Sequence, residues 1–314
     1  MRLPFEPTLV DEGLLTPGQP WRAVRFLAET RSTNDVARDL VAAYAADPGG
    51  APDPGWCVVV TDHQTGGRGR LGRVWEVPAG AAVAVSAVVP LNGAAQVASA
   101  AWLPLCAGLA LSRAIRQVTR AAGHELTPIL KWPNDVLLVD DDDRKVSGIL
   151  CELVSVGVPL RTRAATNGLE REAAAAVVVG VGVNVDQTRA ELPVATATSL
   201  ALAGVSVRRE SLVVAYLREL GALLGAASAL GVESSTTQHP ASSDLERVVR
   251  GAYEDACSTI GARVRVHLPD GSMVEGDAVG LDGSGALVVS TPMGRRSFSA
   301  GDVVHVRRPD GRLA

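Results

Sequence analysis

Five short extended runs follow one another in fewer than 50 residues near the end of the chain. Turn sequences such as Pro-Asp-Gly and Asp-Gly-Ser-Gly separate several of them. The runs are Val264–Leu268, Ser272–Leu281, Ala286–Ser290, Arg295–Ser299 and Val303–Val306. Short strands joined by tight turns are typical of a small β barrel. The sequence therefore predicts a separate C-terminal β domain at residues 261–314.

The chain before Gly261 mixes helical and extended patterns, which predicts an α+β domain over residues 22–260. Ser32-Thr33-Asn34 are good N-cap residues before an apolar stripe, so a helix over Asp35–Ala46 is expected. Further helices are expected at Gln96–Arg120, Arg208–Leu230 and Asp244–Ile260, and strands at Trp56–Thr61, Ala82–Val89, Ile129–Val139, Val146–Val156 and Val177–Val185. Residues 1–21 show no sustained period and are expected to be an irregular lead-in. The segment Thr162–Glu172 is expected to be a surface insertion between strands.

Composition excludes several classes of protein. The chain has 314 residues, 47% of them apolar and 20% charged, which excludes a disordered or collagen-like chain. Its net charge of -4 argues against a broad nucleic-acid-binding surface. Scattered cysteines and histidines indicate neither a disulfide framework nor a metal cluster. Apolar runs of about 11 residues are shorter than the ~20 of a membrane span, so a soluble, cytoplasmic protein is expected.

A glycine-arginine segment, Gln64–Arg73, follows the first predicted strand of this domain. It contains a formal G-x-G-x-x-G pattern at Gly67, Gly69 and Gly72. A dinucleotide site needs a helix to open at the third glycine, and the residues that follow are β-rich instead. The alternative hypotheses are a solvated basic turn and a loop that closes over an anion through its guanidinium groups.

Two lysines stand out because the other 28 cationic residues among the 30 are arginines. Lys131 opens the sequence Lys-Trp-Pro-Asn-Asp, and Lys145 lies 14 positions later, beyond an acidic turn at Asp140–Arg144. Lysine offers a compact charge where the arginine fork does not fit, which suits phosphate handling. The purely structural alternative is a surface hairpin in which Lys145 pairs with the acidic run. Pro133 disturbs strand pairing, so alternation does not tell whether the two lysines share a face.

Taken together, these motifs resemble the biotin–protein ligases. The matching pieces, in order, are Ser32-Thr-Asn34, Gln64–Trp75, Lys131-Trp-Pro-Asn-Asp135, Lys145-x-x-Gly148-Ile-Leu and Gly180-x-Gly-x-Asn-Val185. The resemblance implies a mixed sheet flanked by helices, as in lipoate ligases and class II synthetases, followed by an SH3-like barrel. It further implies ATP-dependent, Mg²⁺-assisted activation of biotin to biotinyl-5'-AMP. The biotinyl group then passes to a lysine of a biotin carboxyl carrier protein.

The resemblance also assigns roles to residues. Lys145, Arg70 and Lys131 are expected to be catalytic, and the resemblance implies that Lys145 steadies the charge that develops during in-line displacement at the α-phosphate. The expected biotin-binding residues are Ser32, Thr33, Asn34, Gln64, Arg68, Gly69, Arg70, Lys145 and Gly148. The expected adenylate-binding residues are Arg68, Arg70, Trp75, Lys131, Asn134, Asp135 and Asn184, with Mg²⁺ near the last three.

The residues alone leave two other functions open. A lipoate or octanoate ligase of the same fold is the main enzymatic alternative, and a biotin-responsive regulator is the non-catalytic one. Fewer than 25 residues precede the catalytic segment, so an N-terminal DNA-binding module is not expected. The expected partners are biotin, ATP and the carrier domain, with no DNA and no membrane.

Overall fold

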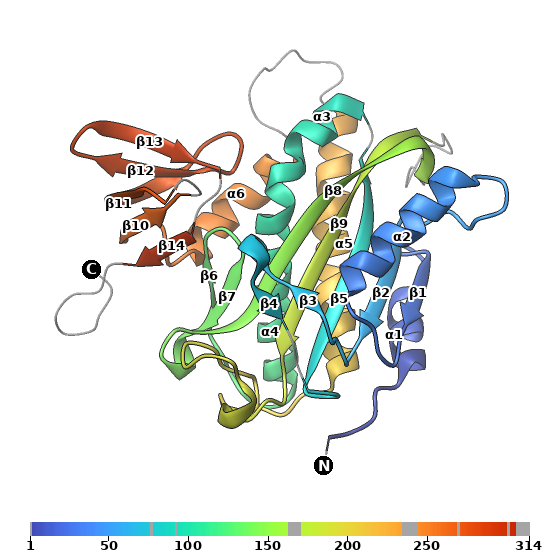
Figure 1. The fold of residues 1–314 in the computed structure, drawn as a ribbon, viewed down its shortest axis with the longest axis horizontal. Helices are drawn as coiled ribbons and strands as arrows, with labels where there is room; N and C mark the ends of the chain where they lie inside the picture. Colours follow the sequence, from blue (N-terminus) through green and yellow to red (C-terminus); the bar gives the residue numbers. More distant parts are fainter. Residues whose placement is uncertain are drawn as a thin grey trace.

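A seven-stranded sheet forms the centre of the larger domain, and a smaller five-stranded sheet lies beside one end of it (Figure 1). The computed structural model describes residues 2–75, 78–91, 93–162, 171–233, 244–268, 271–299 and 302–305. This arrangement of a mixed sheet, flanking helices and a small C-terminal antiparallel sheet confirms the predicted α+β fold.

The central sheet has the strand order β1-β2-β5-β9-β8-β7-β6. Its strands are β1 (Ala23–Phe26), β2 (Cys57–Thr61), β5 (Ala82–Leu91), β6 (Pro128–Lys131), β7 (Asp135–Leu138), β8 (Arg144–Thr162) and β9 (Arg171–Asn184). Only the β1–β2 pair is parallel. The predicted pairing between the segments that became β8 and β9 is confirmed. The continuous apolar run of β5 is explained by burial on both faces, because all ten of its residues are buried.

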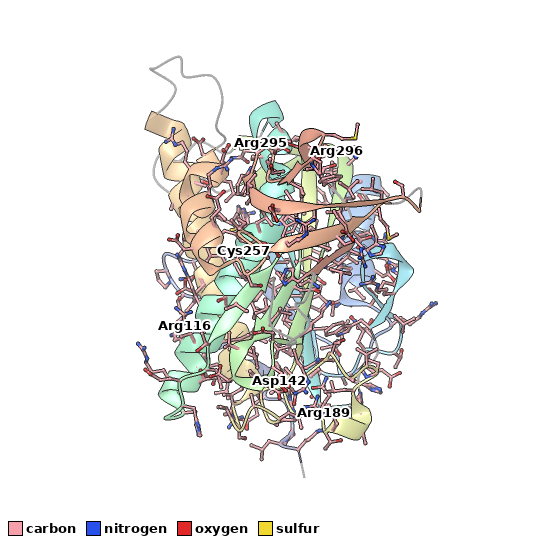
Figure 2. All side chains as sticks on the ribbon, turned by 90° about the vertical axis from the view of Figure 1, so that its left-hand side faces the viewer. Arg116, Asp142, Arg189, Cys257, Arg295 and Arg296 are labelled. Atoms are coloured by element: carbon pink, nitrogen blue, oxygen red, sulfur yellow. The ribbon has the colours of Figure 1, made fainter. Side chains whose placement is uncertain are left out.

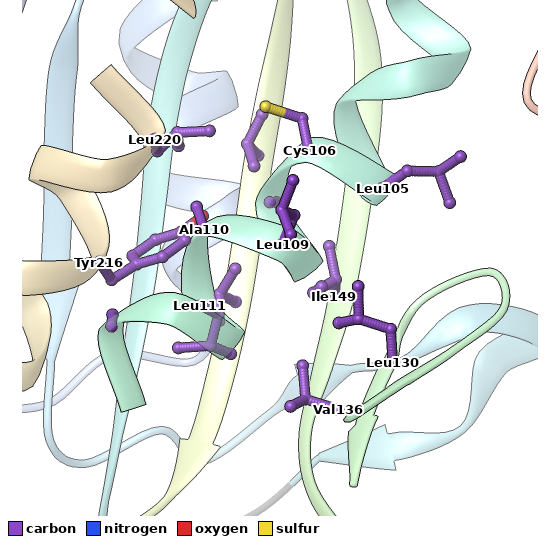
Figure 3. Packing of buried hydrophobic residues seen from close by; sticks show 14 of the residues in the cluster. Leu105, Cys106, Leu109, Ala110, Leu111, Leu130, Val136, Ile149, Tyr216 and Leu220 are labelled. Atoms are coloured by element: carbon purple, nitrogen blue, oxygen red, sulfur yellow. The ribbon is translucent and has the colours of Figure 1, made fainter. Parts of the chain in front are cut away.

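Helices cover both faces of this sheet. Helix α2 (Thr33–Ala46) packs Ala37, Val41 and Tyr44 against one face. On the other face lie α4 (Leu103–Ala121), which follows the short α3 (Gly93–Ala98), and α5 (Arg209–Glu233). Figure 3 shows side chains of α4 between the sheet residue Ile149 and Tyr216 of α5. The alternate residues of each central strand therefore face two different apolar layers.

Two helical segments, Gln96–Ala121 and Arg209–Ser228, are long and apolar enough to span a membrane by length and composition. Their most apolar windows are 67% and 56% buried inside the molecule. Both segments contribute to the main apolar core, which accounts for their hydropathy without a membrane.

The lead-in is not irregular throughout, because residues Pro7–Leu14 form helix α1. Proline favours the first helical turn, and Val10 and Leu14 lie four residues apart on the face that packs on α5. The prediction missed this helix because eight residues give little more than two turns of periodicity. Within Thr162–Glu172, residues 163–170 lie outside the described part of the chain.

The expected strand Ile129–Val139 is also corrected. It is a hairpin of two strands, β6 and β7, on either side of a cis Trp132–Pro133 bond. Proline cannot continue strand pairing at that point, so the chain turns back. The expected helix over Asp244–Ile260 ends at Ala256 as α6 (Asp244–Ala256).

All five predicted C-terminal strands are present, in the order β13-β12-β11-β10-β14. They are β10 (Arg263–His267), β11 (Met273–Leu281), β12 (Leu287–Thr291), β13 (Gly294–Phe298) and β14 (Asp302–His305). Each pair is antiparallel. Figure 2 shows Arg295 and Arg296 of this barrel at the opposite end of the molecule from Asp142 and Arg189.

Candidate active site

The start of helix α2 forms one wall of the site. Ser32 caps the helix, with its Oγ accepting a hydrogen bond from Asp35 N at 3.3 Å. The Thr33 backbone N–H donates to Gln64 Oε1 at 3.0 Å. Ser32, Thr33, Asn34 and Gln64 are all buried. The structure therefore gathers these four predicted residues into one group of neutral hydrogen-bonding side chains.

Two further residues, Ser86 and Glu152, hydrogen-bond to this group of four and were not predicted from the sequence. Ser86 Oγ lies 2.7 Å from Thr33 Oγ1 and 2.6 Å from Asn34 Oδ1. Asn34 Nδ2 donates to Glu152 Oε2 at 2.7 Å, which fixes the orientation of the amide. A lone serine within the apolar run of β5 was a signal for Ser86. Glu152 gave no such signal, because its partner lies 118 positions away.

Glycines provide a flat floor beside this wall. A Cβ at Gly180 would overlap Asn34 Oδ1, and one at Gly182 would lie 2.5 Å from Trp75 Nε1. At Gly148, a Cβ would lie 3.2 Å from Lys145 Nζ and 3.4 Å from the Trp75 ring. The side chains of Asn34 and Trp75 thus lie directly against strand backbone, and these glycines leave the room that they need.

The glycine-arginine segment forms a small hairpin of β3 (Gly67–Arg68) and β4 (Val74–Trp75) around a 3₁₀ turn at Arg70–Gly72. No α-helix opens at the third glycine of the formal G-x-G-x-x-G pattern, so the dinucleotide hypothesis is not supported. Gly69 lies at the start of the turn, where its N–H donates to Arg73 O at 2.6 Å.

Two of the three arginines in this hairpin, Arg68 and Arg70, contact opposite walls. Arg68 forms an ion pair with Asp35, in the first turn of α2. Arg70 Nη1 donates to Asn134 Oδ1 at 3.2 Å. Asp35 also pairs with Arg38, which reaches Glu152 at 3.1 Å. The hairpin is therefore held across the site by side-chain contacts at both of its sides.

The two lysines share a face of the sheet. Lys131 lies directly opposite Asp135 in the β6–β7 hairpin, and opposed residues of antiparallel strands project to the same side. Lys145 Nζ lies 2.6 Å from Asp135 Oδ1 and 5.8 Å from the centre of the Trp75 ring. The alternative in which Lys145 pairs with the acidic run is not supported.

The acidic run has its own partners instead. Arg144 pairs with Asp141 at 2.6 Å and with Asp142 at 2.9 Å, and Arg189 pairs with Asp141 at 3.3 Å. Asp141 loses solvation, but bonds from Thr198 and the two arginines outweigh that effect and hold its pKa below the ordinary value. Because arginines pair with the acidic run, Lys145 remains paired with Asp135 in the site.

Asn184 holds the chain segment next to Lys145 through its side-chain hydrogen bonds. It is 4% exposed, donates to Thr198 O at 2.8 Å and accepts a bond from Gln187 Nε2 at 2.8 Å. Thr198 N in turn donates to Lys145 O at 2.8 Å. Asn184 therefore fixes the strand-like segment that lies along the backbone of Lys145.

Protein ligands for a resident metal are few. Among the described residues, no group of three or more His, Cys, Asp or Glu side chains could hold a metal ion. The amide oxygens of Asn134 and Asn184 already accept hydrogen bonds, and Asp135 is the one carboxylate among the three residues expected near Mg²⁺. This donor set suits Mg²⁺ that arrives on substrate phosphates and meets one protein carboxylate.

Two cysteines near the site are neutral thiols. Burial raises the pKa of Cys106 to about 12 and raises that of Cys151 further. A thiol nucleophile needs a lowered pKa and an electropositive setting. The site therefore offers cations and amides for binding an anion, and not a cysteine nucleophile.

A cavity of about 420 Å³ adjoins the turn Trp132–Asn134. Arg70 and Asn134 line one side of this cavity, and Ser284–Ala286 of the barrel line the other. Apolar groups of α4 and β8, among them Leu105 and Ile149, complete its wall. The site is thus bounded by both domains.

The chain matches two described families in order. Residues 42–163 match the Biotin/lipoate A/B protein ligase family, and residues 259–306 match the Biotin protein ligase C terminal domain. The second match falls on the barrel strands.

Individual proteins give the same result. The chain is 32% identical over 311 residues to the biotin–[acetyl-CoA-carboxylase] ligase of Mycobacterium tuberculosis, and the match covers 98% of both chains. It is 35% identical over 149 residues to the enzyme of that name from Paracoccus denitrificans, which covers 48% of this chain and 55% of that one. The fold is similar to that of the biotin protein ligase from Aquifex aeolicus in complex with biotin and ATP, with a TM-score of 0.59 and 23% identity over 90% of this chain and 98% of that one.

Proposed function

The chain belongs to the biotin–protein ligase family, and on that premise we propose that the site described above carries out both half-reactions of an ATP-dependent biotin–protein ligase. In the first, the biotin carboxylate attacks the α-phosphate of ATP, pyrophosphate leaves and biotinyl-5'-AMP forms. In the second, a lysine amine attacks the mixed anhydride, an amide forms and AMP leaves.

One observation carries the assignment of these steps to this site. Two cations, Lys145 and Arg70, are held by Asp135 and Asn134 beside a wall of neutral hydrogen-bonding side chains. A neutral wall suits the uncharged head of biotin, and fixed cations suit the carboxylate and phosphate that react. A single site therefore offers both kinds of recognition at neighbouring positions.

On the biotin side, we assign the head group to Ser32, Thr33, Asn34 and Gln64. Their burial removes competing water, so each hydrogen bond to the ligand gains in strength. Gly148 leaves room beside Lys145 for the ligand to reach the ammonium group. Arg68 and Gly69 lie in the hairpin that closes this side.

On the phosphate side, Lys145 lies where charge develops during in-line displacement, and Arg70 and Lys131 add positive charge at the same face. Mg²⁺ enters with ATP as part of the substrate, and Asp135 is the carboxylate positioned to meet it. Trp75 offers an aromatic face to the adenylate, and Asn184 keeps the backbone at Lys145 in place. The hairpin that carries Trp75 would cover the water-labile adenylate.

We assign the acceptor lysine to a biotin carboxyl carrier protein or domain. ATP is the co-substrate, and the four cysteines are free thiols. Both features are typical of the cytoplasm, which we propose as the location.

Mass spectrometry tests the whole reaction. A carrier domain is incubated with enzyme, biotin and ATP, with parallel samples that lack each small molecule and one in which lipoate replaces biotin. We expect a gain of one biotinyl group on one lysine only in the complete mixture. An unmodified carrier, or modification by lipoate instead of biotin, would contradict the proposal.

A further inference from the structure

We propose that Trp132 is a positioning residue through which the C-terminal barrel holds the catalytic turn Lys131–Asp135. This inference rests on the proposed function of the site. It concerns how the two domains cooperate, because the turn belongs to the larger domain and its supports belong to the barrel side of the molecule.

The indole of Trp132 is 2% exposed and reaches into the barrel. Its Nε1 donates to Gly285 O at 3.0 Å, in the turn Asp282–Gly285 between β11 and β12, called the barrel turn below. Its backbone N–H donates to Thr259 Oγ1 at 3.0 Å, in the segment that leads into the barrel. Thr259 Oγ1 in turn lies 3.0 Å from His305 Nε2 of strand β14. Trp132 is therefore fixed from two directions.

The barrel turn is itself firmly seated. Arg250 of α6 donates to Leu281 O at 2.6 Å and to Asp282 O at 2.7 Å. Gly285 has a φ of 78°, and a Cβ there would lie 3.1 Å from Leu105 Cδ1. The carbonyl that Trp132 uses thus belongs to a rigid support.

The catalytic contacts begin two residues after Trp132. Asn134 Oδ1 accepts from Arg70, Asn134 Nδ2 donates to Ile149 O at 2.9 Å, and Asp135 pairs with Lys145. A shift of the indole would be transmitted through Pro133, whose ring leaves little conformational freedom. Because the barrel turn also forms one wall of the cavity beside Arg70 and Asn134, the same support sets two sides of the site.

The simplest alternative is that the indole only attaches the barrel to the larger domain. The chain contains a matched control for that alternative. Trp102 is 0% exposed, and its Nε1 donates at 3.0 Å to Gly283 O, two residues earlier in the same barrel turn. Trp102 lies just before α4 and not in the catalytic turn. Trp102→Phe and Trp132→Phe therefore remove equivalent bonds to the barrel, and only the second touches the site.

The experiment compares Trp132→Phe, Trp102→Phe and the unsubstituted enzyme. Biotin-dependent ATP–pyrophosphate exchange measures adenylate formation, calorimetry measures biotin affinity, and thermal unfolding measures stability. We expect Trp132→Phe to lower the exchange rate about 10- to 100-fold, since a displacement near 1 Å can cost that much. Trp102→Phe should stay within about twofold. Both should lower the unfolding midpoint similarly, and neither should change biotin affinity.

Equal exchange rates in the two variants, or a loss of biotin affinity in Trp132→Phe as large as its loss of rate, would overturn the inference. Thr259→Val removes the second support and gives an independent arm if Trp132→Phe does not fold. We expect it to lower exchange in the same way, and an unchanged rate would count against the proposal. Absence of exchange in the unsubstituted enzyme would instead overturn the proposed function.

Discussion

Asp135 Oδ1 and Lys145 Nζ lie 2.6 Å apart across the neighbouring strands β7 and β8. Without this pair, the Lys145 ammonium group would have, among the described residues, only the Trp75 ring to hold it beside the glycine floor. An anionic ligand must share or take over the ammonium group from Asp135. The pair therefore keeps the cation oriented before the phosphate arrives.

Substitution of Lys145 tests this arrangement. Lys145→Ala should lower the rate of adenylate formation about 100- to 1,000-fold, as for loss of a group that stabilises developing charge. Lys145→Arg should not restore it, because a planar fork cannot replace a compact charge between Asp135 and the Trp75 ring. Biotin-dependent pyrophosphate exchange measures both, with Arg116→Ala on the exposed face of α4 as the control. Activity of the Arg variant near that of the unsubstituted enzyme would contradict the prediction.

Arg70→Ala should also slow adenylate formation while the fold survives. The side chain is only partly buried and bonds to Asn134, so the free energy of unfolding should change by no more than about 1 kcal/mol. Urea unfolding and the exchange assay separate the two effects. A stability loss above about 3 kcal/mol would show that Arg70 is structural.

Gly182→Ala tests the glycine floor. The new methyl group would lie 2.5 Å from Trp75 Nε1, so the indole must move. We expect a changed Trp75 environment in difference fluorescence against Trp75→Phe, slower adenylate formation in the exchange assay, and a stability loss of about 1–3 kcal/mol. The control is Gly225→Ala in α5. The new Cβ there would meet no atom of the described residues within 4 Å apart from its own helix backbone, and the substitution should stabilise the helix by up to about 1 kcal/mol. An unchanged rate of adenylate formation in Gly182→Ala would argue that the floor does not lie at the ligand.

Helix α1 offers a test of packing away from the site. Leu14 is 0% exposed against α5, and truncation to alanine should cost about 2–5 kcal/mol. The neighbouring Leu15 is 44% exposed, and Leu15→Ala should cost no more than about 0.5 kcal/mol. Both variants should keep normal exchange activity per folded molecule. Equal unfolding midpoints would show that α1 does not pack as described.

Acid should weaken the attachment of the N-terminal segment. The Thr188 backbone N–H and then the Arg2 side chain hold the pKa of Glu191 at about 2, against an ordinary value of 4.5. The folded pKa is lower than the unfolded one, so the contribution is complete above pH 4.5 and falls as pH drops toward 2. Glu191→Gln should have a shallower decline of unfolding midpoint over that interval. If the midpoint of Glu191→Gln declines as steeply as that of the unsubstituted protein, Glu191 does not contribute to the loss of stability in acid.

Local patterns were sufficient for much of the fold. The short β runs after Gly261 and the helix capped by Ser32 all formed close to their predicted bounds, because turn chemistry and periodicity act over a few residues. The glycines and arginines of Gln64–Trp75 likewise indicated a ligand-closing segment. Family resemblance and structure agree on the helices and strands, whereas closure of Gln64–Trp75 over a ligand stays a prediction.

Other features depended on contacts between distant parts of the chain. Which acid pairs with Lys145 was decided by the turn at Pro133 and by the register shift between Val136 and Leu137, which together set the face of each side chain. Glu152 and Trp132 acquired their roles from partners more than 100 positions away. The sequence by itself determined the elements and the chemistry available. Only the tertiary structure decided which groups meet, because pairing register and interdomain contacts depend on the packing of the whole chain.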